Sequence, residues 1–139
     1  MPCLSGRFDP RTGPLINVGV LASGTLRPAS AQPTQVPAFP SLIDTGASLT
    51  CISPNVAQTV GLQPIGKRSM VSATQAVPVN VYLVDFVLPF GAAGLVLQGT
   101  QVMEFSPGGN SPFQILVGRD IICQGILTMS FDGHFTFSL

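Results

Sequence analysis

The sequence predicts a mainly β protein with one or two short helices, and three observations support this fold class. Runs rich in Val, Ile, Leu and Phe recur along the chain, and segments rich in Gly, Pro and Ser separate them, as expected of strands joined by turns. One segment alone, 53–61, carries both the start and the stop signals of a helix. Near the C-terminus, Asp132-Gly133 lies between two apolar runs, which is typical of a two-residue hairpin.

The first half of the chain predicts two strands and a helix after an irregular arm. Residues 1–14 are interrupted by prolines and glycines and are expected to be that arm. The apolar runs 15–21 and 39–43 predict strands, and the Ser-, Ala-, Gln- and Pro-rich segment 23–38 predicts a loop or a poorly ordered hairpin tip between them. The helix at 53–61 has Ser as its N-cap, Pro at its first position and Gly at its stop.

From residue 67 onward, the pattern is almost entirely that of strands. The runs 68–71 and 77–83 flank the small-residue segment 72–76, which predicts a hairpin with an exposed tip. Further strands are predicted at 95–103, 113–117, 126–131 and 134–139, a loop at 106–112, and one helical turn at 121–124. Phe131, Phe135 and Phe137 alternate at a strand period and are expected in a core or an interface.

Length and composition favour one small domain that buries part of its surface against a partner. The 139 residues fit a single domain spanning 1–139, and 45% of them are apolar while only 9% are charged. So low a charge favours partner-covered apolar surface. Six basic and six acidic residues give no net charge, so the composition does not support binding to nucleic acid.

The cysteines predict neither a disulfide framework nor a metal site. Cys3, Cys51 and Cys123 are far apart, three thiols cannot all pair within one chain, and one histidine does not complete a zinc site with them. Reduced thiols favour a cytoplasmic location. The longest apolar stretch, 79–97, is broken by Asp, Pro and Gly and is expected to be strands rather than a membrane span. The N-terminus lacks the apolar region of a signal peptide, although a targeting segment outside this sequence is not excluded.

Asp44 is the strongest candidate for a catalytic residue. It follows an apolar run and begins Asp44-Thr45-Gly46, where Gly46 allows a tight turn and a close approach of another backbone. Two carboxylates in contact share one proton, because like charges about 3 Å apart cannot both ionise. The ionised carboxylate can then take a proton from water while the protonated one donates to a carbonyl oxygen. Taken alone, the tripeptide is equally consistent with a common β-turn.

A second motif gives the tripeptide its significance. Two apolar residues precede Gly118-Arg119-Asp120 and two follow it, and a hairpin lies between this motif and Leu42-Ile43-Asp44-Thr45-Gly46-Ala47. Together these features resemble the retropepsin-like aspartic proteases, most strongly over 41–62 and 113–125. The resemblance implies a single-lobe acid protease fold, with a closed, barrel-like β-sheet and a flap hairpin.

The resemblance also implies roles for individual residues. Asp44 would be the catalytic aspartate, Thr45 would bond to the matching loop of a partner chain, and Gly46 and Ala47 would meet the substrate backbone. The positions that match pocket and flap residues are Leu42, Ser48, Cys51, Gln114 and Leu116, with Ser72, Ala73, Thr74 and Gln75 at the flap tip. Gly118 and Arg119 match the pair that supports the active-site loop. No cofactor and no metal are implied.

A dimer follows from the chemistry. The chain contains one Asp-Thr-Gly and no Asp-Ser-Gly, so a dyad requires a second copy of the chain. The partners expected are therefore a second copy, in a homodimer, and a peptide or protein substrate.

Two departures from the family pattern stand out. Ser48 occupies the position of an aspartate that pairs with the arginine in retroviral proteases, which leaves Arg119 to pair with Asp120, with Asp132 or with no charged group. The segment 72–76 contains no glycine, so its tip is expected to be less pliant than a retroviral flap.

These observations predict an aspartic endopeptidase that acts as a homodimer on extended segments with apolar side chains. Processing of a precursor or of regulatory proteins is the expected role. The alternative is a non-catalytic dimerisation or peptide-binding module that retains the fold. The intact Asp-Thr-Gly favours the enzyme, because a module without catalysis has no need of that aspartate.

Ala47 generates a prediction about pH. A serine there would donate a hydrogen bond to a neighbouring carboxylate and favour its ionised form, which alanine does not do. The chain is therefore expected to be active in mildly acidic to near-neutral solution, and Ala47→Ser should move the acidic limb of the pH–rate profile to lower pH. An acidic limb that stays in place in this variant contradicts the explanation.

Overall fold

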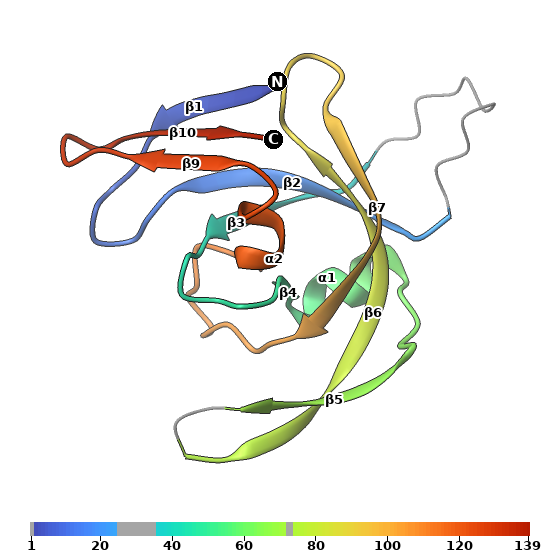
Figure 1. Cartoon of the computed structure of the whole chain (residues 1–139). Coiled ribbons are helices and arrows are strands. Elements are labelled where there is room, and N and C mark those ends of the chain that lie inside the picture. The colour runs from blue at the N-terminus through green and yellow to red at the C-terminus, as the bar shows by residue number, and fades with distance from the viewer. Residues whose placement is uncertain (1, 25–35, 72–73) are drawn as a thin grey trace.

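The computed structural model describes residues 2–24, 36–71 and 74–139, and it is mainly β with two short helices (Figure 1). In these residues the elements are β1 (Cys3–Arg7), β2 (Leu15–Ala22), β3 (Ala38–Ile43), β4 (Cys51–Ile52), α1 (Pro54–Val60), β5 (Gly66–Val71), β6 (Ala76–Leu88), β7 (Leu95–Glu104), β8 (Ile115–Val117), α2 (Arg119–Ile122), β9 (Ile126–Met129) and β10 (His134–Ser138).

The larger sheet closes on itself. Its strand order is β2-β3-β8-β4-β7-β6-β5, and an additional antiparallel pairing of β2 with β6 completes the closure. Six of the described strands thus form a barrel, and β5 extends from it as the outer partner of β6. The predicted barrel-like sheet is confirmed. Closure satisfies the backbone of strands that would otherwise be open edges.

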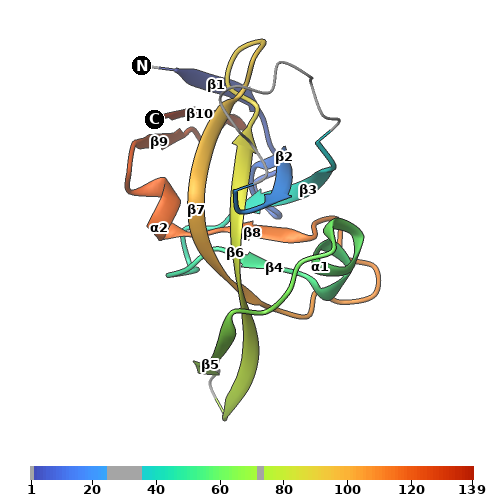
Figure 2. The same ribbon diagram turned by 90° about the vertical axis from the view of Figure 1, so that its right-hand side faces the viewer.

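The parallel pairing of β3 with β8 brings two distant motifs together. Leu42 lies opposite Leu116, and Ile43 lies opposite Val117. Because both strands run in the same direction, the Asp-Thr-Gly that follows β3 and the Gly-Arg-Asp that follows β8 leave the sheet at the same edge. Figure 2 shows β8 beside β4 in the middle of the barrel, with α1 at one end of these strands.

The core fills the barrel with branched and aromatic side chains. In β2, Ile16, Val18 and Val20 point inward at a period of two, and Leu15 and Asn17 lie on the exposed side. Twenty buried residues form one continuous apolar cluster among those described. The packed core supports the sheet edge at which the Asp-Thr-Gly and Gly-Arg-Asp motifs begin.

The first helix follows its predicted signals. The hydroxyl of Ser53 accepts a hydrogen bond from the backbone of Val56 at 3.3 Å, Pro54 begins α1, and Gly61 ends it with a φ of 77°. The second helix begins at residue 119, two residues before the predicted turn, because the carbonyl of Gly118 accepts from both Ile121 and Ile122. Neither helix in the described ranges is long and apolar enough to cross a membrane.

The prediction of an irregular arm over 1–14 is wrong for residues 3–7. They form β1, which pairs antiparallel with β10 in a smaller sheet of order β1-β10-β9, so the two ends of the chain lie side by side (Figure 1). Gly6 contributed to the wrong prediction, because a glycine is unfavourable in the interior of a strand. In the fold it makes room for the ring of Phe135, which a Cβ on Gly6 would meet at 2.8 Å.

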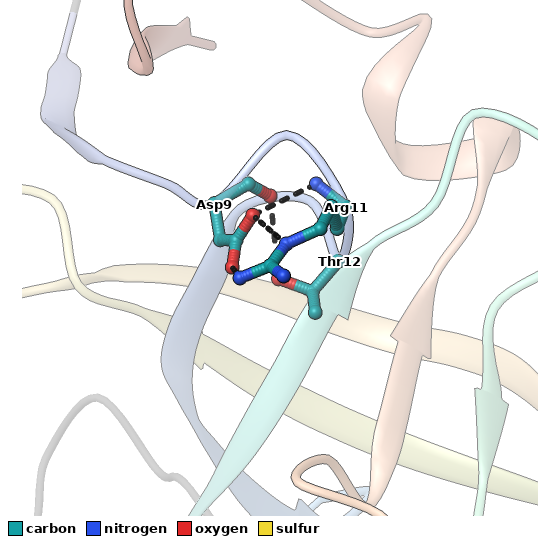
Figure 3. A network of polar contacts seen from close by, with 3 residues as sticks. All are labelled: Asp9, Arg11 and Thr12. Carbon is teal, nitrogen blue, oxygen red and sulfur yellow. Dashed lines mark hydrogen bonds and ion pairs between the residues drawn. The ribbon is translucent and has the colours of Figure 1, made fainter.

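A compact turn joins β1 to β2 (Figure 3). The carboxylate of Asp9 accepts from the backbone and the guanidinium of Arg11, and the backbone and hydroxyl of Thr12 donate to the Asp9 carbonyl. These contacts with Arg11 lower the pKa of Asp9. Pro14 follows, and its carbonyl accepts from Ile43 at 2.9 Å. The turn thus leads the chain directly to the end of β3.

The C-terminal hairpin has a longer turn than predicted. The backbone of Ser130 donates to the carbonyl of His134 at 2.8 Å, so Phe131, Asp132 and Gly133 form a three-residue loop with Gly133 at a φ of 86°. Phe131 is 100% exposed, whereas Phe135 and Phe137 are buried. Of the two places expected for this aromatic series, Phe135 and Phe137 occupy the core, and an interface stays the prediction for Phe131.

Two predicted segments fall partly outside the described residues. The loop 23–38 is described only at 23–24 and 36–38, and the hairpin tip at 72–76 only at 74–76. The strands that flank this tip are confirmed as β5 and β6, and their register runs from Gly66 opposite Val81 to Val71 opposite Ala76. The hairpin projects from the barrel (Figure 1).

Phe137 and Phe131 provide a matched test of the packing. Phe137→Ala should lower the free energy of unfolding by about 3–5 kcal/mol, because it leaves a cavity in the core. Phe131→Ala, in the same hairpin but fully exposed, should change it by about 0.5 kcal/mol or less. Urea unfolding of both variants measures the difference, and equal losses would contradict this placement of the two rings.

Candidate active site

Asp44 lies in a tight turn at the end of β3. Its backbone N–H donates to the carbonyl of Val117 at 2.9 Å, which continues the pairing of β3 with β8 by one residue. The chain then turns, because the Asp44 carboxylate accepts from the backbone of Gly46 at 2.9 Å and the Asp44 carbonyl accepts from Ala47 at 3.2 Å. Asp44 as a whole is half-buried, and the hydrogen bond that its carboxylate accepts from Gly46 is exposed to solvent.

Arg119 holds the same turn from the other strand. Its backbone N–H donates to the carbonyl of Ala47, and its guanidinium donates to the carbonyl of Thr45, both at 2.8 Å. No ion pair of Arg119 occurs within the described residues. The sequence left Asp120, Asp132 or no charged group as the partner of Arg119, and the structure shows the last of these. A guanidinium that binds a backbone carbonyl fixes the loop whatever residue stands at position 48.

Asp120 and Thr50 form a second contact between the two segments. The Thr50 hydroxyl donates to one carboxylate oxygen of Asp120 at 2.7 Å, and the Thr50 backbone donates to the other at 3.1 Å. The same hydroxyl accepts from the backbone of Gly118 at 3.0 Å. Thr50 is 0% exposed and its bond with Gly118 is buried, whereas the half-buried Asp120 leaves the two carboxylate contacts partly shielded from water. Sequence reasoning missed this pair, and its only local signal was a Thr six residues after Asp44.

Gly118 is required by the closeness of the two segments. A Cβ at this position would lie 2.7 Å from the carbonyl carbon of Leu49 and 3.0 Å from the carbonyl oxygen of Ala47. Both atoms belong to the backbone and have no freedom to move aside. Any larger residue would thus push the Asp44 loop away from β8.

A cleft of about 620 Å³ opens beside the Asp44 turn. It lies between this turn, strand β5 of the projecting hairpin, and the segment that follows β7. The lining residues are Gly46, Ala47, Ser48, Leu49, Cys51, Arg68, Ser69, Met70, Val71, Met103, Phe105, Ser106 and Leu116. Cys51, Met103, Leu49, Met70 and Leu116 also belong to one apolar cluster, which forms the floor. The volume falls within the usual range of ligand sites.

The structure brings some of the predicted site residues together at this cleft. Gly46, Ala47, Ser48, Cys51 and Leu116 line it, next to Asp44 and Thr45. The predictions missed the contribution of β5 and of Met103, Phe105 and Ser106. Those residues show no motif, and only the pairing of β4 with β7 and of β5 with β6 brings them to the cleft.

The other predicted site residues lie elsewhere. Leu42 does not line the cleft and lies against Gly13, and Gln114 accepts a hydrogen bond from the hydroxyl of Ser53 at 2.7 Å beside α1. Thr74 and Gln75 are exposed and do not line the cleft. Ser72 and Ala73 lie outside the described residues.

Cys51 is an uncharged part of the floor. It is 7% exposed, and its thiol donates to the carbonyl of Leu49 at 3.4 Å. Burial, followed by the charges of Asp120 and Asp44, raises the pKa of Cys51 to about 11. The thiol therefore stays protonated near neutral pH and presents an apolar surface. Within the part of the chain that is described, no group of His, Cys, Asp and Glu side chains could hold a metal ion.

Comparisons with known proteins place this geometry in a family. The family described as aspartyl protease matches residues 32–131, which is more than half of the chain and includes both motifs. The chain therefore belongs to the aspartyl protease family, and it is an aspartic-type peptidase. No curated protein matches its sequence significantly.

A solved structure shows the same fold. The crystal structure of a retropepsin-like aspartic protease from Rickettsia conorii matches with a TM-score of 0.65, covering 97% of this chain and 89% of that one. The two sequences are 12% identical, so the likeness concerns the fold. The fold is retropepsin-like, as the sequence resemblance implied.

Thr50 provides a test of the contact between the two segments. Thr50→Val keeps the shape but removes the hydroxyl bond to the Asp120 carboxylate, which retains its two backbone donors, and leaves the buried Gly118 N–H without its acceptor. It should therefore lower the free energy of unfolding by about 3 kcal/mol. Thr50→Ser keeps the hydroxyl and loses one buried methyl group, so it should cost about 1 kcal/mol. Urea unfolding compares them, and a valine variant as stable as the serine variant would contradict the role of the hydroxyl.

Proposed function

We propose that this chain is an endopeptidase that works as a homodimer, in which each subunit contributes Asp44 to one shared dyad. The observation that carries the proposal is the single Asp44 turn, held by backbone hydrogen bonds beside an apolar cleft. The turn supplies one of the two carboxylates that the chemistry requires, and the sequence holds no second Asp-Thr-Gly.

The proposed mechanism uses the two aspartates in different protonation states. The ionised Asp44 removes a proton from a water molecule, which then attacks the substrate carbonyl carbon. The protonated Asp44 of the partner subunit donates its proton to the carbonyl oxygen. As the tetrahedral diol breaks down, the Asp44 that took the proton from water donates it to the leaving nitrogen, the partner subunit's Asp44 takes a proton from one hydroxyl group, and the C–N bond breaks to give the acid and the amine. The two carboxylates titrate as a pair, so the pH dependence of the activity describes both of them together and is not assigned to either subunit.

Thr45 supports the dimer. Its hydroxyl has no hydrogen-bond partner among the described residues, and its backbone carbonyl is held by Arg119. A hydroxyl fixed at the outside of the turn is suited to bond with the matching turn of a second copy. Arg119 and Gly118 then act as supports, which keep the Asp44 turn in the position that the partner requires.

The cleft supports a preference for extended peptides with apolar side chains. Its floor is apolar, and Gly46 and Ala47 leave space for a substrate backbone. The projecting β5–β6 hairpin acts as a flap that adds strand-like hydrogen bonds to the peptide and excludes water. Ala47 and Ser48 contact the substrate from the walls of the cleft, and Cys51 and Leu116 contact it from the floor. The same proposal gives Ser72, Ala73, Thr74 and Gln75, at the flap tip, contacts with the bound peptide.

The setting proposed for this activity is precursor or regulatory processing in the cytoplasm, by one protease domain that spans 1–139. The three cysteines are free, which agrees with a reducing compartment.

Asp44→Asn tests the proposal directly. Cleavage of a peptide library should fall by about a thousandfold or more at every pH, because asparagine neither accepts a proton from water nor donates one to the carbonyl. The matched control is Asp132→Asn, at an exposed aspartate in the C-terminal hairpin, which should retain activity. Mass spectrometry of the products measures both variants.

Two results would decide against the enzyme. Full cleavage by Asp44→Asn would place catalysis elsewhere. A wild-type dimer that binds peptides and cuts none of them, with Asp44→Asn binding equally well, would instead support the non-catalytic module.

A further inference from the structure

The described lining of the cleft beside Asp44 carries positive charge but no negative charge. Arg68 is the only charged residue among the described residues that line it, and no acidic side chain lines it. Arg68 is exposed, and neither of the two ion pairs among the described residues involves it. The guanidinium therefore presents unused donors at an apolar wall.

The direction of the Arg68 side chain follows from its strand. Arg68 and Met70 are two residues apart in β5 and therefore lie on the same face of the hairpin. Met70 packs against the cluster that contains Cys51 and Met103, which is the cleft floor. Val79, which pairs with Arg68, packs against the same cluster, so this face of β5 is the one turned toward the cleft floor, while Ser69 and Val71 of the other face also line the cleft. Lys67 alternates to the other face and does not line the cleft.

The spacing of these two residues matches that of an extended peptide. Side chains two residues apart on a strand point the same way and lie about 7 Å apart. A peptide aligned along β5 would thus place one side chain over Met70 and the floor, and another beside Arg68. The cleft volume of about 620 Å³ leaves room for both. A carboxylate is the group that a planar guanidinium binds best.

We propose that Arg68 selects substrates that carry Asp or Glu two residues away from an apolar side chain that fills the cleft floor. The proposal rests on the proposed function and names a substrate class for the same site. The carboxylate of the substrate accepts hydrogen bonds from the guanidinium, and it thereby fixes the register of the peptide against the flap strand. Arg68 is thus a specificity-determining residue.

The test uses peptides that the wild-type protein cleaves. Each peptide is prepared with Glu, Gln or Lys in turn at every position within four residues of the cut bond. At one position, Glu should raise kcat/KM about fivefold over Gln, and Lys should lower it. Raising the salt concentration to about 1 M should reduce the preference, because the guanidinium is exposed and its attraction is screened.

Three variants assign the effect to the residue. Arg68→Ala should abolish the preference for Glu, and Arg68→Glu should reverse it in favour of Lys, a gain that loss of folding does not produce. Lys67→Ala, which removes the same charge from the opposite face of the same strand, should retain the preference. Retention of the preference in Arg68→Ala, or its loss in Lys67→Ala, would overturn the proposal.

The outcome for this inference is separable from that for the proposed function. Cleavage by the wild-type protein with no position that prefers Glu would overturn the role of Arg68 alone. If the wild-type protein cuts no peptide, the endopeptidase fails, and the role of Arg68 is measured instead by fluorescence anisotropy, as the binding to Asp44→Asn of extended peptides with one apolar side chain, each prepared with Glu or Gln at every other position in turn. Equal affinity for the Glu and Gln forms at every position would then overturn its role as well.

Discussion

The hydrogen bonds between the Asp44 loop and the segment after β8 hold the site together. The backbone of Asp44 and the carbonyls of Thr45 and Ala47 are bound by Val117 and Arg119. The Thr50–Asp120 contact closes the loop at its other end. A catalytic carboxylate must be placed to within a fraction of an ångström, and backbone contacts at both ends of a short loop restrict it to that degree.

This contact depends in turn on the topology of the barrel. The parallel pairing of β3 with β8 makes both motifs leave the sheet at one edge, and Gly118 allows their backbones to touch. The same closure brings β4 beside β7, which adds Met103 and Phe105 to the cleft wall. The barrel therefore forms the loop support and the apolar floor together, and a change in either pairing would affect both.

The parts of this structure that the sequence predicted are those with local causes. Ser53, Pro54 and Gly61 determine the ends of α1 through contacts within a few residues, and the two motifs mark the catalytic edge without knowledge of the fold. The errors concern long-range partners. Gly6 lies in a strand because Phe135, far along the chain, needs the space. Leu42 lies against Gly13 rather than the cleft. For Arg119 the sequence left three alternatives open, and the fold selects the one without a charged partner, because the guanidinium binds the Thr45 carbonyl. Arg68 has no motif at all and reaches the cleft only through the pairing of β5 with β6.

The central claim is that the active site is shared by two copies of the chain. Molar mass by light scattering, measured on a dilution series together with the specific activity of each sample, tests it most directly. The shared dyad predicts that specific activity falls in proportion to the fraction of dimer and vanishes in the monomer. Undiminished activity in samples that are entirely monomeric would contradict it.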